Sequence, residues 1–466
     1  MNTHVIEKPV FVFVSNYLNH HQIPFCNAMY EICGGSFAFV QTEPVEEERV
    51  RMGWAEQVQQ PYLRLYYQEE EACKRLISDA ELVMFGGCED ESYIQGRLAQ
   101  GKAVIRCSER LYRTGQWKAV SPRGLKKKYH DHTRYRKSPV YLLCAGAYVP
   151  SDFSIVRAYP GKMYCWGYFT ETKHYDVDRL LAGKGWREPD AAGADSGASD
   201  TAGAVGGASD TADTASGAGK VPYILWAARM IELKHPELAL ETARHLKSEG
   251  LSFHMDMIGG GAMEERMKVL RAEYGLEKEV GFPGFLAPEQ VREYMERADI
   301  FLFTSDRQEG WGAVINEAMN SGCGLIAGHM AGAAPFLVHD GENGFIYRDG
   351  NRKELFALAE RLVRDRELCA RLGRNAYRTI TEIWNAENAA KSLWELCGSL
   401  GLIRGGGRMK ESRQKASDRK PSDCPTGDFH GSAACEKAGF APAPCAPAAV
   451  IPERKMYALL KREKRQ

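Results

Sequence analysis

The stretch SDRQEGWGAVINEAMNSGCGLIAGHMAGAAPFLVHDGENGF, from Ser305 to Phe345, carries most of the information about the fold of this 466-residue chain. It follows the apolar run DIFLF, so a strand is expected to end shortly before Gly310 and a helix to begin over 312–321. A second apolar run, GLIAG, comes directly after that helix. Strand, helix and strand in this order form a βαβ unit, which predicts a parallel sheet.

The same alternation extends over both halves of the chain. Between 223 and 381, the runs YILWAA, FHMDMI and DIFLF alternate with helix-like stretches, the first of which covers 235–249 with one apolar stripe. Between 10 and 163, the runs PVFVFV, SFAFV, ELVMF, KAVIR and VYLLC alternate with helical stretches over 22–31 and 91–100. The sequence therefore predicts an α/β protein with two Rossmann-like, doubly wound domains that face a central cleft.

Breaks in this rhythm predict the division of the chain. Residues 190–219 consist almost wholly of Ala, Gly, Ser, Thr and Asp, which cannot bury a core, and the region 403–450 has no periodicity. The expected units are an N-terminal domain over 1–170, a linker over 171–220 with the flexible insert 190–219, a C-terminal domain over 221–384, a crossover helix over 385–402, and a mostly disordered tail over 403–466 that ends in a short basic helix over 452–464.

The composition excludes several classes of protein. Lys plus Arg and Asp plus Glu both number 61, so no overall charge draws the chain onto nucleic acid or lipid. The 13 cysteines are scattered and never form a C-x-x-C pair, which favours reduced thiols in the cytoplasm and argues against zinc. No run of about 18 apolar residues occurs, so no membrane-spanning helix is expected, and the first run, at 10–14, is interpreted as a buried strand.

Acidic and glycine residues of the opening stretch form a candidate binding site. A helix that begins near Gly312 points its free N–H groups at a docked anion, and Gly310 and Gly312 let the backbone approach closely. Glu309 precedes the helix and Glu317 lies about a turn and a half inside it, so the two carboxylates can accept hydrogen bonds from two sets of vicinal hydroxyls. The alternative is a structural glycine turn with one capping acid and one surface acid.

Two cations of the same half strengthen the binding hypothesis. Arg229 and Lys234, in WAARMIELKHPE, follow an earlier strand of the same sheet, whose end is expected to face the same crevice. Two positive charges beside a helix start suit a diphosphate that no metal neutralises. Exposed salt bridges are the alternative for both side chains.

From Glu309 to Gly344 the sequence resembles the E-x7-E signature of the retaining glycosyltransferases of family four, a GT-B group that includes sucrose synthase and many bacterial polysaccharide enzymes. The family's pattern of E-G-F/W-G, E-A-M-A-x-G, a strand, a G-G or A-G turn and D-G-x-N-G corresponds here to EGWG, EAMNSG, GLIAG, AG and DGENG. The five-residue offset between Arg229 and Lys234 equals that of the family's phosphate-binding Arg and Lys. The resemblance covers about 223–386 well and the N-terminal half in outline.

The resemblance implies a role for each matching position. Arg229 and Lys234 bind the diphosphate, Glu309 binds the hydroxyls of the transferred sugar, and Glu317 binds the ribose. The other implied donor-binding residues are Gly310, Trp311, Gly312, Ala313, Val314 and Gly284, the last within a loop that borders the base. The implied reaction moves a sugar from a nucleotide-sugar donor to a saccharide or lipid-linked acceptor hydroxyl with retention of configuration, in bacterial surface polysaccharide or glycoconjugate synthesis, without a metal or another cofactor.

The N-terminal half is expected to hold the acceptor. The loop SNYLNHHQIPF carries Asn16, Asn19, His20 and His21 before a helix, at the position of the family's acceptor loop, although the usual glycine pair is missing. The alternative is that these histidines only cap the helix or lie on the surface. In KAVIRCSERLY, Ser108 and Glu109 stand where the family commonly has His-Asp. Glu109 is therefore the candidate for the remaining catalytic group, with helix capping as its alternative.

Lys and Arg are concentrated between 110 and 137. The cations Arg123, Lys126, Lys127, Lys128, Arg134, Arg136 and Lys137 alternate with Tyr112, Trp117, Tyr129 and Tyr135. One hypothesis is a peripheral contact with an anionic membrane that carries a lipid-linked acceptor. The alternatives are a solvated basic face and RNA binding. No RNA-binding motif accompanies the charge, so a nucleic-acid partner is not expected.

Two other functions compete with sugar transfer. A sugar-nucleotide epimerase on the same paired domains needs dedicated acid and base groups, and the missing His-Asp pair argues against it. A binding module that retains the nucleotide site without catalysis is the second rival. Product analysis without acceptor, and calorimetry of donor binding, separate the three.

Overall fold

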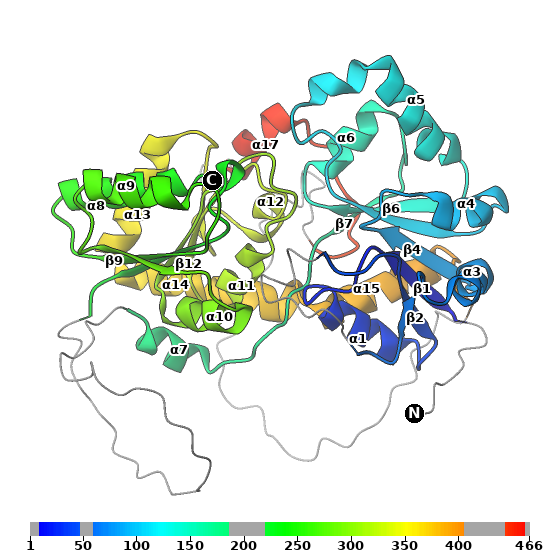
Figure 1. The fold of residues 1–466 in the computed structure, drawn as a ribbon, viewed down its shortest axis with the longest axis horizontal. Coiled ribbons are helices and arrows are strands. Elements are labelled where there is room, and N and C mark those ends of the chain that lie inside the picture. Colours follow the sequence, from blue (N-terminus) through cyan, green and yellow to red (C-terminus); the bar gives the residue numbers. More distant parts are fainter. Residues whose placement is uncertain (1–8, 47–58, 186–219, 405–442, 462–466) are drawn as a thin grey trace, which may run out of the picture.

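The structure, a computed structural model, describes residues 9–46, 59–185, 220–404 and 443–461. Two parallel β-sheets lie side by side, each covered by helices (Figure 1). The predicted α/β class with two facing doubly wound sheets is confirmed. Within the described residues, no helix combines the length and apolar character that crossing a membrane requires. The predicted insert 190–219 lies outside the described residues.

The N-terminal sheet has the strand order β3-β2-β1-β4-β5-β6-β7. Its strands β1, β2 and β4 are buried along their whole length, as is typical of a parallel sheet that is covered on both faces. Its elements are β1 (Phe11–Ser15), α1 (Ile23–Ile32), β2 (Phe37–Gln41), β3 (Leu63–Leu65), α3 (Glu70–Asp79), β4 (Leu82–Gly86), α4 (Ser92–Ala99), β5 (Val104–Ser108), η1 (Gln116–Val120), α5 (Pro122–Asp131), η2 (Thr133–Tyr135), β6 (Val140–Ala145), α6 (Val149–Ile155) and β7 (Met163–Trp166).

The C-terminal sheet has the order β10-β9-β8-β11-β12-β13 and follows the short helix α7 (Val177–Gly183). Its strand order reverses between β8 and β11, where ligands bind on sheets of this kind. Its elements are β8 (Tyr223–Ala227), η3 (Glu232–Lys234), α8 (Pro236–Ser248), β9 (His254–Ile258), α9 (Glu264–Glu273), β10 (Val280–Gly284), α10 (Pro288–Arg297), β11 (Ile300–Phe303), α11 (Val314–Asn320), β12 (Gly324–Gly328), α12 (Ala334–Leu337), β13 (Phe345–Tyr347), α13 (Arg352–Arg364) and α14 (Arg366–Arg378).

One apolar core joins the two sheets. Trp311 and Trp384 from the C-terminal half belong to the same buried cluster as Phe25, Trp166 and Phe169 from the N-terminal half. The rings of Phe169 and Trp384 are stacked with their centroids 6.1 Å apart. The two halves are therefore held together by aromatic side chains as well as by the chain itself.

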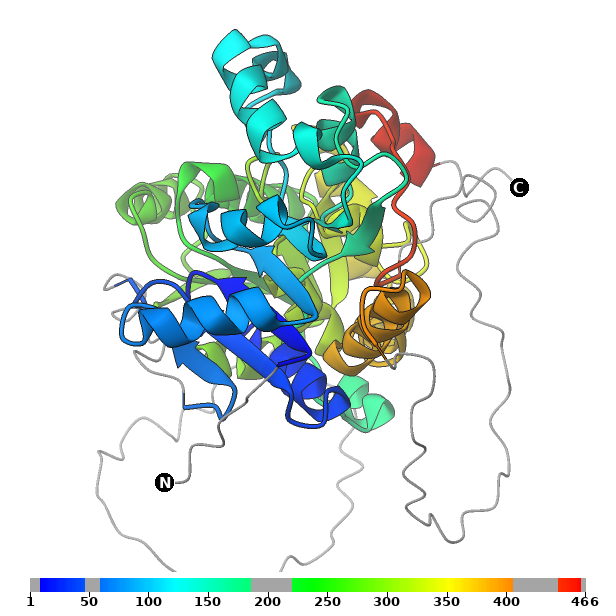
Figure 2. The ribbon, with the colours of Figure 1, turned by 90° about the vertical axis from the view of Figure 1, so that its right-hand side faces the viewer.

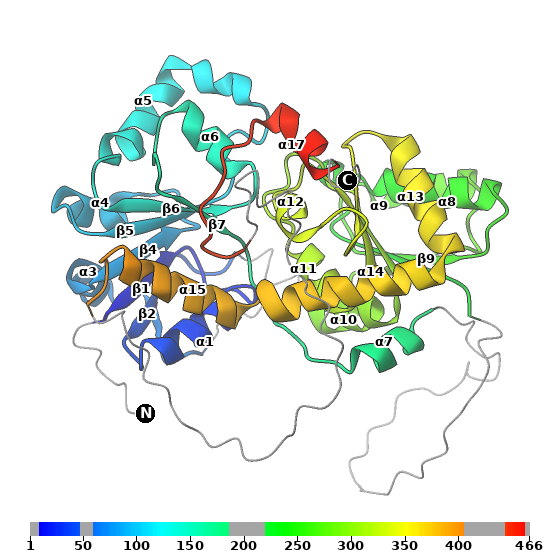
Figure 3. The ribbon, with the colours of Figure 1, turned by 180° about the vertical axis from the view of Figure 1, so that it is seen from behind.

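The chain returns to the N-terminal half after its second sheet. The π-helix η4 (Thr379–Ile383) leads into α15 (Ala386–Ser399), whose start is capped by the Asn385 side chain. Figure 3, the view from behind, shows α14 and α15 running one after the other across the molecule. Helix α15 packs against α1. The crossover helix predicted over 385–402 corresponds to α15.

Residues 443–461, here called the C-terminal strap, are ordered and contact both halves. Backbone N–H groups of Cys445 and Ala448 donate to the carbonyls of Cys165 and Met163 at 2.8 and 2.9 Å, beside β7. The strap ends in α17 (Glu453–Leu460), which lies between the two halves in Figures 1 and 3. The short predicted helix is thus present, but the prediction of disorder is wrong for 443–450, because a regular backbone ladder needs no periodic side chains. Residues 405–442 lie outside the described part.

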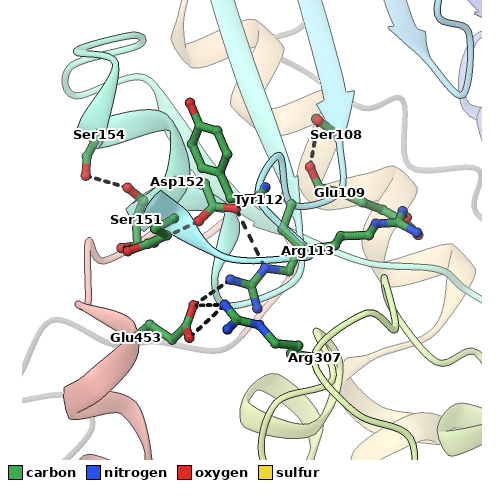
Figure 4. Close-up of polar contacts among 11 residues, drawn as sticks. Ser108, Glu109, Tyr112, Arg113, Ser151, Asp152, Ser154, Arg307 and Glu453 are labelled. Carbon is green, nitrogen blue, oxygen red and sulfur yellow. Dashed lines mark hydrogen bonds and ion pairs between the residues drawn. The ribbon is translucent and has the colours of Figure 1, made fainter. Parts of the chain in front are cut away.

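Glu453 of α17 connects side chains from both halves (Figure 4). Its carboxylate accepts from Nη2 of Arg110 at 2.7 Å and from Nη2 of Arg307 at 3.0 and 3.1 Å. Nε of Arg110 lies 3.7 Å from the fully buried carboxylate of Asp152, whose pKa is raised by burial, although Arg110 opposes that rise. The helix at the end of the strap therefore links the two domains through ion pairs of Glu453 with Arg110 and Arg307.

Candidate functional site

The loops after β8 and β11 bring two predicted site residues together. These strands are neighbours in the sheet, and the ammonium of Lys234 makes an ion pair with the carboxylate of Glu309. The pair is largely enclosed, with 16% and 14% of the two side chains exposed. The backbone of Lys234 is fixed by hydrogen bonding, because the Thr304 hydroxyl donates to its carbonyl at 2.6 Å and accepts from the Trp226 indole at 2.8 Å.

Arg229 is exposed on the same loop as Lys234, beside a glycine turn. A Cβ atom on Gly259 would lie 2.0 Å from the carbonyl oxygen of Ala228, and the φ of Gly259 is +129°. Only glycine allows this approach. Gly284, at the end of β10, accepts from the Gly259 N–H at 2.9 Å. The ends of β8, β9 and β10 therefore meet beside Arg229 and Gly284.

The turn before α11 is shaped by Gly312 and anchored by Trp311. Gly312 has a φ of +93°, and the helix begins at Val314 after its N-cap Ala313. Helix α11 is thus shorter than the predicted span 312–321, because Gly312 keeps a left-handed backbone. The Trp311 side chain is buried, donates from Nε1 to Oδ1 of Asn316 at 2.9 Å, and lies against Gly167 of the N-terminal half.

Glu109 reaches this turn from the opposite sheet. A Cβ atom on Gly310 would lie 2.2 Å from a carboxylate oxygen of Glu109. The carboxylate accepts from the Tyr168 hydroxyl at 2.6 Å and makes an ion pair with Arg113. The next helix begins only at Gln116, so the alternative that Glu109 caps a helix is wrong. The sequence interpretation missed Tyr168 and Arg113. Tyr168 follows β7, a strand that was not assigned from the sequence and that would have indicated this position.

The predicted acceptor loop brings histidines to Glu317. One ligand atom each of His20, His21 and Glu317 lie within 4.8 Å of one another, so this group is also a possible cation ligand set. Burial raises the pKa of Glu317 to about 7, and Arg292 partly opposes that rise. Asn19 has a structural role, because its side-chain oxygen accepts from the His21 N–H at 3.0 Å. Asn16 accepts from the Ser15 hydroxyl at 3.3 Å.

A pocket of about 480 Å³ opens at the carboxyl ends of the N-terminal strands. Its lining includes the aromatic residues Phe13, Phe25, Trp166, Tyr168 and Phe169. Charged and polar groups also reach it, among them His21, Gln22, Glu89, Glu109 and Arg113. Since Glu109 also contacts Gly310, the pocket adjoins the loop that carries Glu309.

Strand ends of the two sheets meet face to face, which is the defining arrangement of the GT-B fold. In addition to the contact between Glu109 and Gly310, two hydrogen bonds join the halves. The Ala147 N–H donates to the Gly332 carbonyl at 3.1 Å, and the Tyr148 hydroxyl donates to the His329 carbonyl at 2.7 Å. HepE of Anabaena in complex with UDP-glucose shares this fold, with a TM-score of 0.54 and 13% identity over 84% of this chain and 99% of HepE.

Residues 210–379 match the model of the glycosyl transferases group 1 family. The amylovoran biosynthesis glycosyltransferase AmsK of Erwinia amylovora is 33% identical over 144 residues, 30% of this chain and 35% of AmsK. A GDP-mannose-dependent phosphatidylinositol monomannoside mannosyltransferase of Mycobacterium tuberculosis is 25% identical over 183 residues, 38% of this chain and 47% of that protein. The chain thus matches between about a third and a half of the length of these relatives.

Proposed function

We propose that this protein is a glycosyltransferase that moves a sugar from a nucleotide-sugar donor to a saccharide or lipid-linked acceptor hydroxyl, with retention of configuration, in the bacterial cytoplasm. The observation that carries the proposal is the meeting of the Lys234–Glu309 pair with Glu109 around the Gly310 turn. Names of relatives support the substrate classes, since AmsK is named for a polysaccharide and the mycobacterial enzyme for a lipid-linked acceptor. HepE supports a nucleotide sugar as donor.

In this proposal the donor diphosphate binds between the loops after β8 and β11. Lys234 and the exposed Arg229 supply positive charge there, so they neutralise phosphate oxygens without a metal. When the donor is bound, Lys234 shifts from Glu309 toward the phosphate, and the freed carboxylate accepts hydrogen bonds from sugar hydroxyls. Glu317 is proposed to accept hydrogen bonds from the ribose.

The reaction exchanges one bond at the anomeric carbon. The bond to the diphosphate oxygen breaks and the leaving group takes the electron pair, while Lys234 and Arg229 stabilise the negative charge that develops on it. The acceptor oxygen attacks on the same face, and its proton passes to a phosphate oxygen of the leaving group. Glu109 lies on the far side of the Gly310 turn, where its carboxylate orients the sugar or the acceptor.

Replacement of Lys234 tests this function. Lys234→Ala should lower turnover with a nucleotide sugar by about 100- to 1,000-fold, because charge on the leaving group loses its main stabilising cation. The assay is sugar transfer to saccharide and lipid-linked acceptors, run with and without a chelator of divalent metals. Lys278→Ala, at an exposed position of the same half, is the matched control. Wild-type turnover in Lys234→Ala, or loss of turnover with the chelator, would contradict the mechanism.

A further inference from the structure

Positive charge in the N-terminal half is concentrated in one projecting segment. Residues 111–137, here called the basic hairpin, contain nine Lys and Arg residues and one acidic residue, Asp131. They form η1, α5 and η2, and Figure 2 shows these helices standing out from the body of the molecule. The chain as a whole has equal numbers of basic and acidic residues, but the basic hairpin is strongly basic.

The same hairpin exposes large apolar side chains. Trp117, Val120, Leu125 and Tyr129 are 71%, 77%, 41% and 61% exposed. They are four of the nine exposed large apolar residues in the described part of the chain, within a span of 13 residues. Single exposed apolar residues are ordinary on a protein surface, but a cluster among cations marks a contact surface.

The geometry of the hairpin groups these side chains. Trp117 and Val120 are three residues apart in a 3₁₀-helix, which has three residues per turn, so they lie on one edge. Leu125 and Tyr129 are four apart on α5 and share one face. Ser121 joins the two pairs and caps α5 by accepting from the Gly124 N–H at 3.5 Å.

The base of the hairpin is fixed to the domain. The Thr133 hydroxyl donates to the Val156 carbonyl at 2.9 Å, and Nδ1 of the buried His132 ring forms a hydrogen bond with the Tyr159 hydroxyl at 2.9 Å. At the other end, Arg113 belongs to the pocket lining. The exposed cluster is therefore presented by an anchored element whose first residues reach the pocket.

We propose that the basic hairpin docks this protein onto a membrane surface with anionic lipid headgroups. Lys and Arg side chains bind the headgroups, while Trp117 and Tyr129 suit the interface and Val120 and Leu125 enter the acyl boundary. The aliphatic pair favours lipid over RNA, because Val and Leu offer no ring on which a base can stack. The proposal does not depend on sugar transfer, but it would place the pocket beside acceptors held in the bilayer.

Vesicle sedimentation of the full chain, without donor or acceptor, tests the proposal. Vesicles of phosphatidylcholine alone are compared with vesicles of equal parts phosphatidylcholine and phosphatidylglycerol. We expect binding to the anionic vesicles only, weakened by salt. Arg123→Glu/Lys126→Glu and, separately, Trp117→Ser/Leu125→Ser should each reduce binding by about tenfold or more.

Control variants remove charged and apolar side chains away from the hairpin. Lys278→Glu/Lys353→Glu removes two exposed cations of the C-terminal half, and Val269→Ser removes an exposed apolar side chain. Both should bind vesicles as the wild type does. The proposal fails if the wild type does not sediment with anionic vesicles, if the hairpin variants still do, or if the controls lose binding equally. It also fails if single-stranded RNA outcompetes the vesicles through the same side chains.

Discussion

At the scale of single residues, the contact between Glu109 and Gly310 sets what can occupy the space beside Glu309. The carboxylate is held by Tyr168 and Arg113, so its position is defined before any ligand binds. If Glu109 orients the reacting groups by its charge, Glu109→Gln should lower kcat by roughly 100-fold or more, with little change in the KM for the donor. Steady-state kinetics measures both constants.

Glu89→Gln is the matched control, because Glu89 lines the same pocket from an exposed position. Tyr168→Phe should have a smaller effect than Glu109→Gln, since it removes one hydrogen bond and leaves the charge. If Glu109→Gln and Glu89→Gln have equal kinetics, Glu109 has no special role.

Glu317 should couple stability to pH. Its pKa rises from 4.5 to about 7 in the folded protein, so the folded state holds a proton that the unfolded state releases in this window. Stability from this group is complete below about pH 4.5 and is lost as pH rises through about 7, by about 3 kcal/mol in all. Glu317→Gln cannot ionise, so its melting temperature relative to wild type should increase between about pH 5 and pH 8.

His20 and His21 lie close to Glu317, so the pH series is repeated in a His20→Gln/His21→Gln background. The relative gain of Glu317→Gln should persist there. A difference in melting temperature that stays constant with pH would show that the Glu317 carboxyl has an ordinary pKa.

The sequence predicted residue positions only where strand ends determine them. Lys234 and Glu309 were placed together correctly because each follows a strand of one parallel sheet, and such strands end at one edge. It could not place Glu317 against His20 and His21, since that contact depends on how the two sheets face each other. The roles proposed for these residues remain predictions.

At the scale of elements, α15 belongs to the second half in sequence and to the first half in packing. Leu393 is fully buried in the cluster that also holds Phe25 and Met29 of α1. Leu393→Ala should therefore destabilise the protein by about 2–5 kcal/mol, through lost burial and a residual cavity. Denaturant unfolding measures the loss.

The exposed neighbour Lys391 gives the matched control for this change. Lys391→Ala should alter the free energy of unfolding by no more than about 0.5 kcal/mol. Equal effects of the two substitutions would contradict the packing of α15 on α1.

Long apolar elements were predictable, whereas short or paired ones were not. The runs at β1, β4 and β8 are continuous and apolar, so their strands could be assigned from sequence. β3 is three residues long and half-buried, which gives no clear pattern. The backbone pairing of residues 445–448 with β7 leaves no periodic signal at all.

At the scale of the whole molecule, the C-terminal strap ties the two domains through Glu453. Glu453→Gln should cost about 1–3 kcal/mol, because the almost fully buried Arg110 keeps only Asp152 as an acidic partner. Thermal unfolding measures the loss, and small-angle X-ray scattering should show a larger radius of gyration if the tie limits opening. Lys455→Gln, an exposed change on α17, is the control. An unchanged melting temperature and radius of gyration in Glu453→Gln would show that Glu453 does not hold the two domains together.

The aromatic cluster shared by the two halves gives the molecule a built-in optical signal. Trp311 and Trp384 lie with their ring centroids 5.9 Å apart, and both are almost completely shielded from water. Separation of the halves would hydrate these indoles and move their fluorescence to longer wavelength. The native chain therefore needs no dye for a stopped-flow record of hinge motion as substrates arrive and products leave.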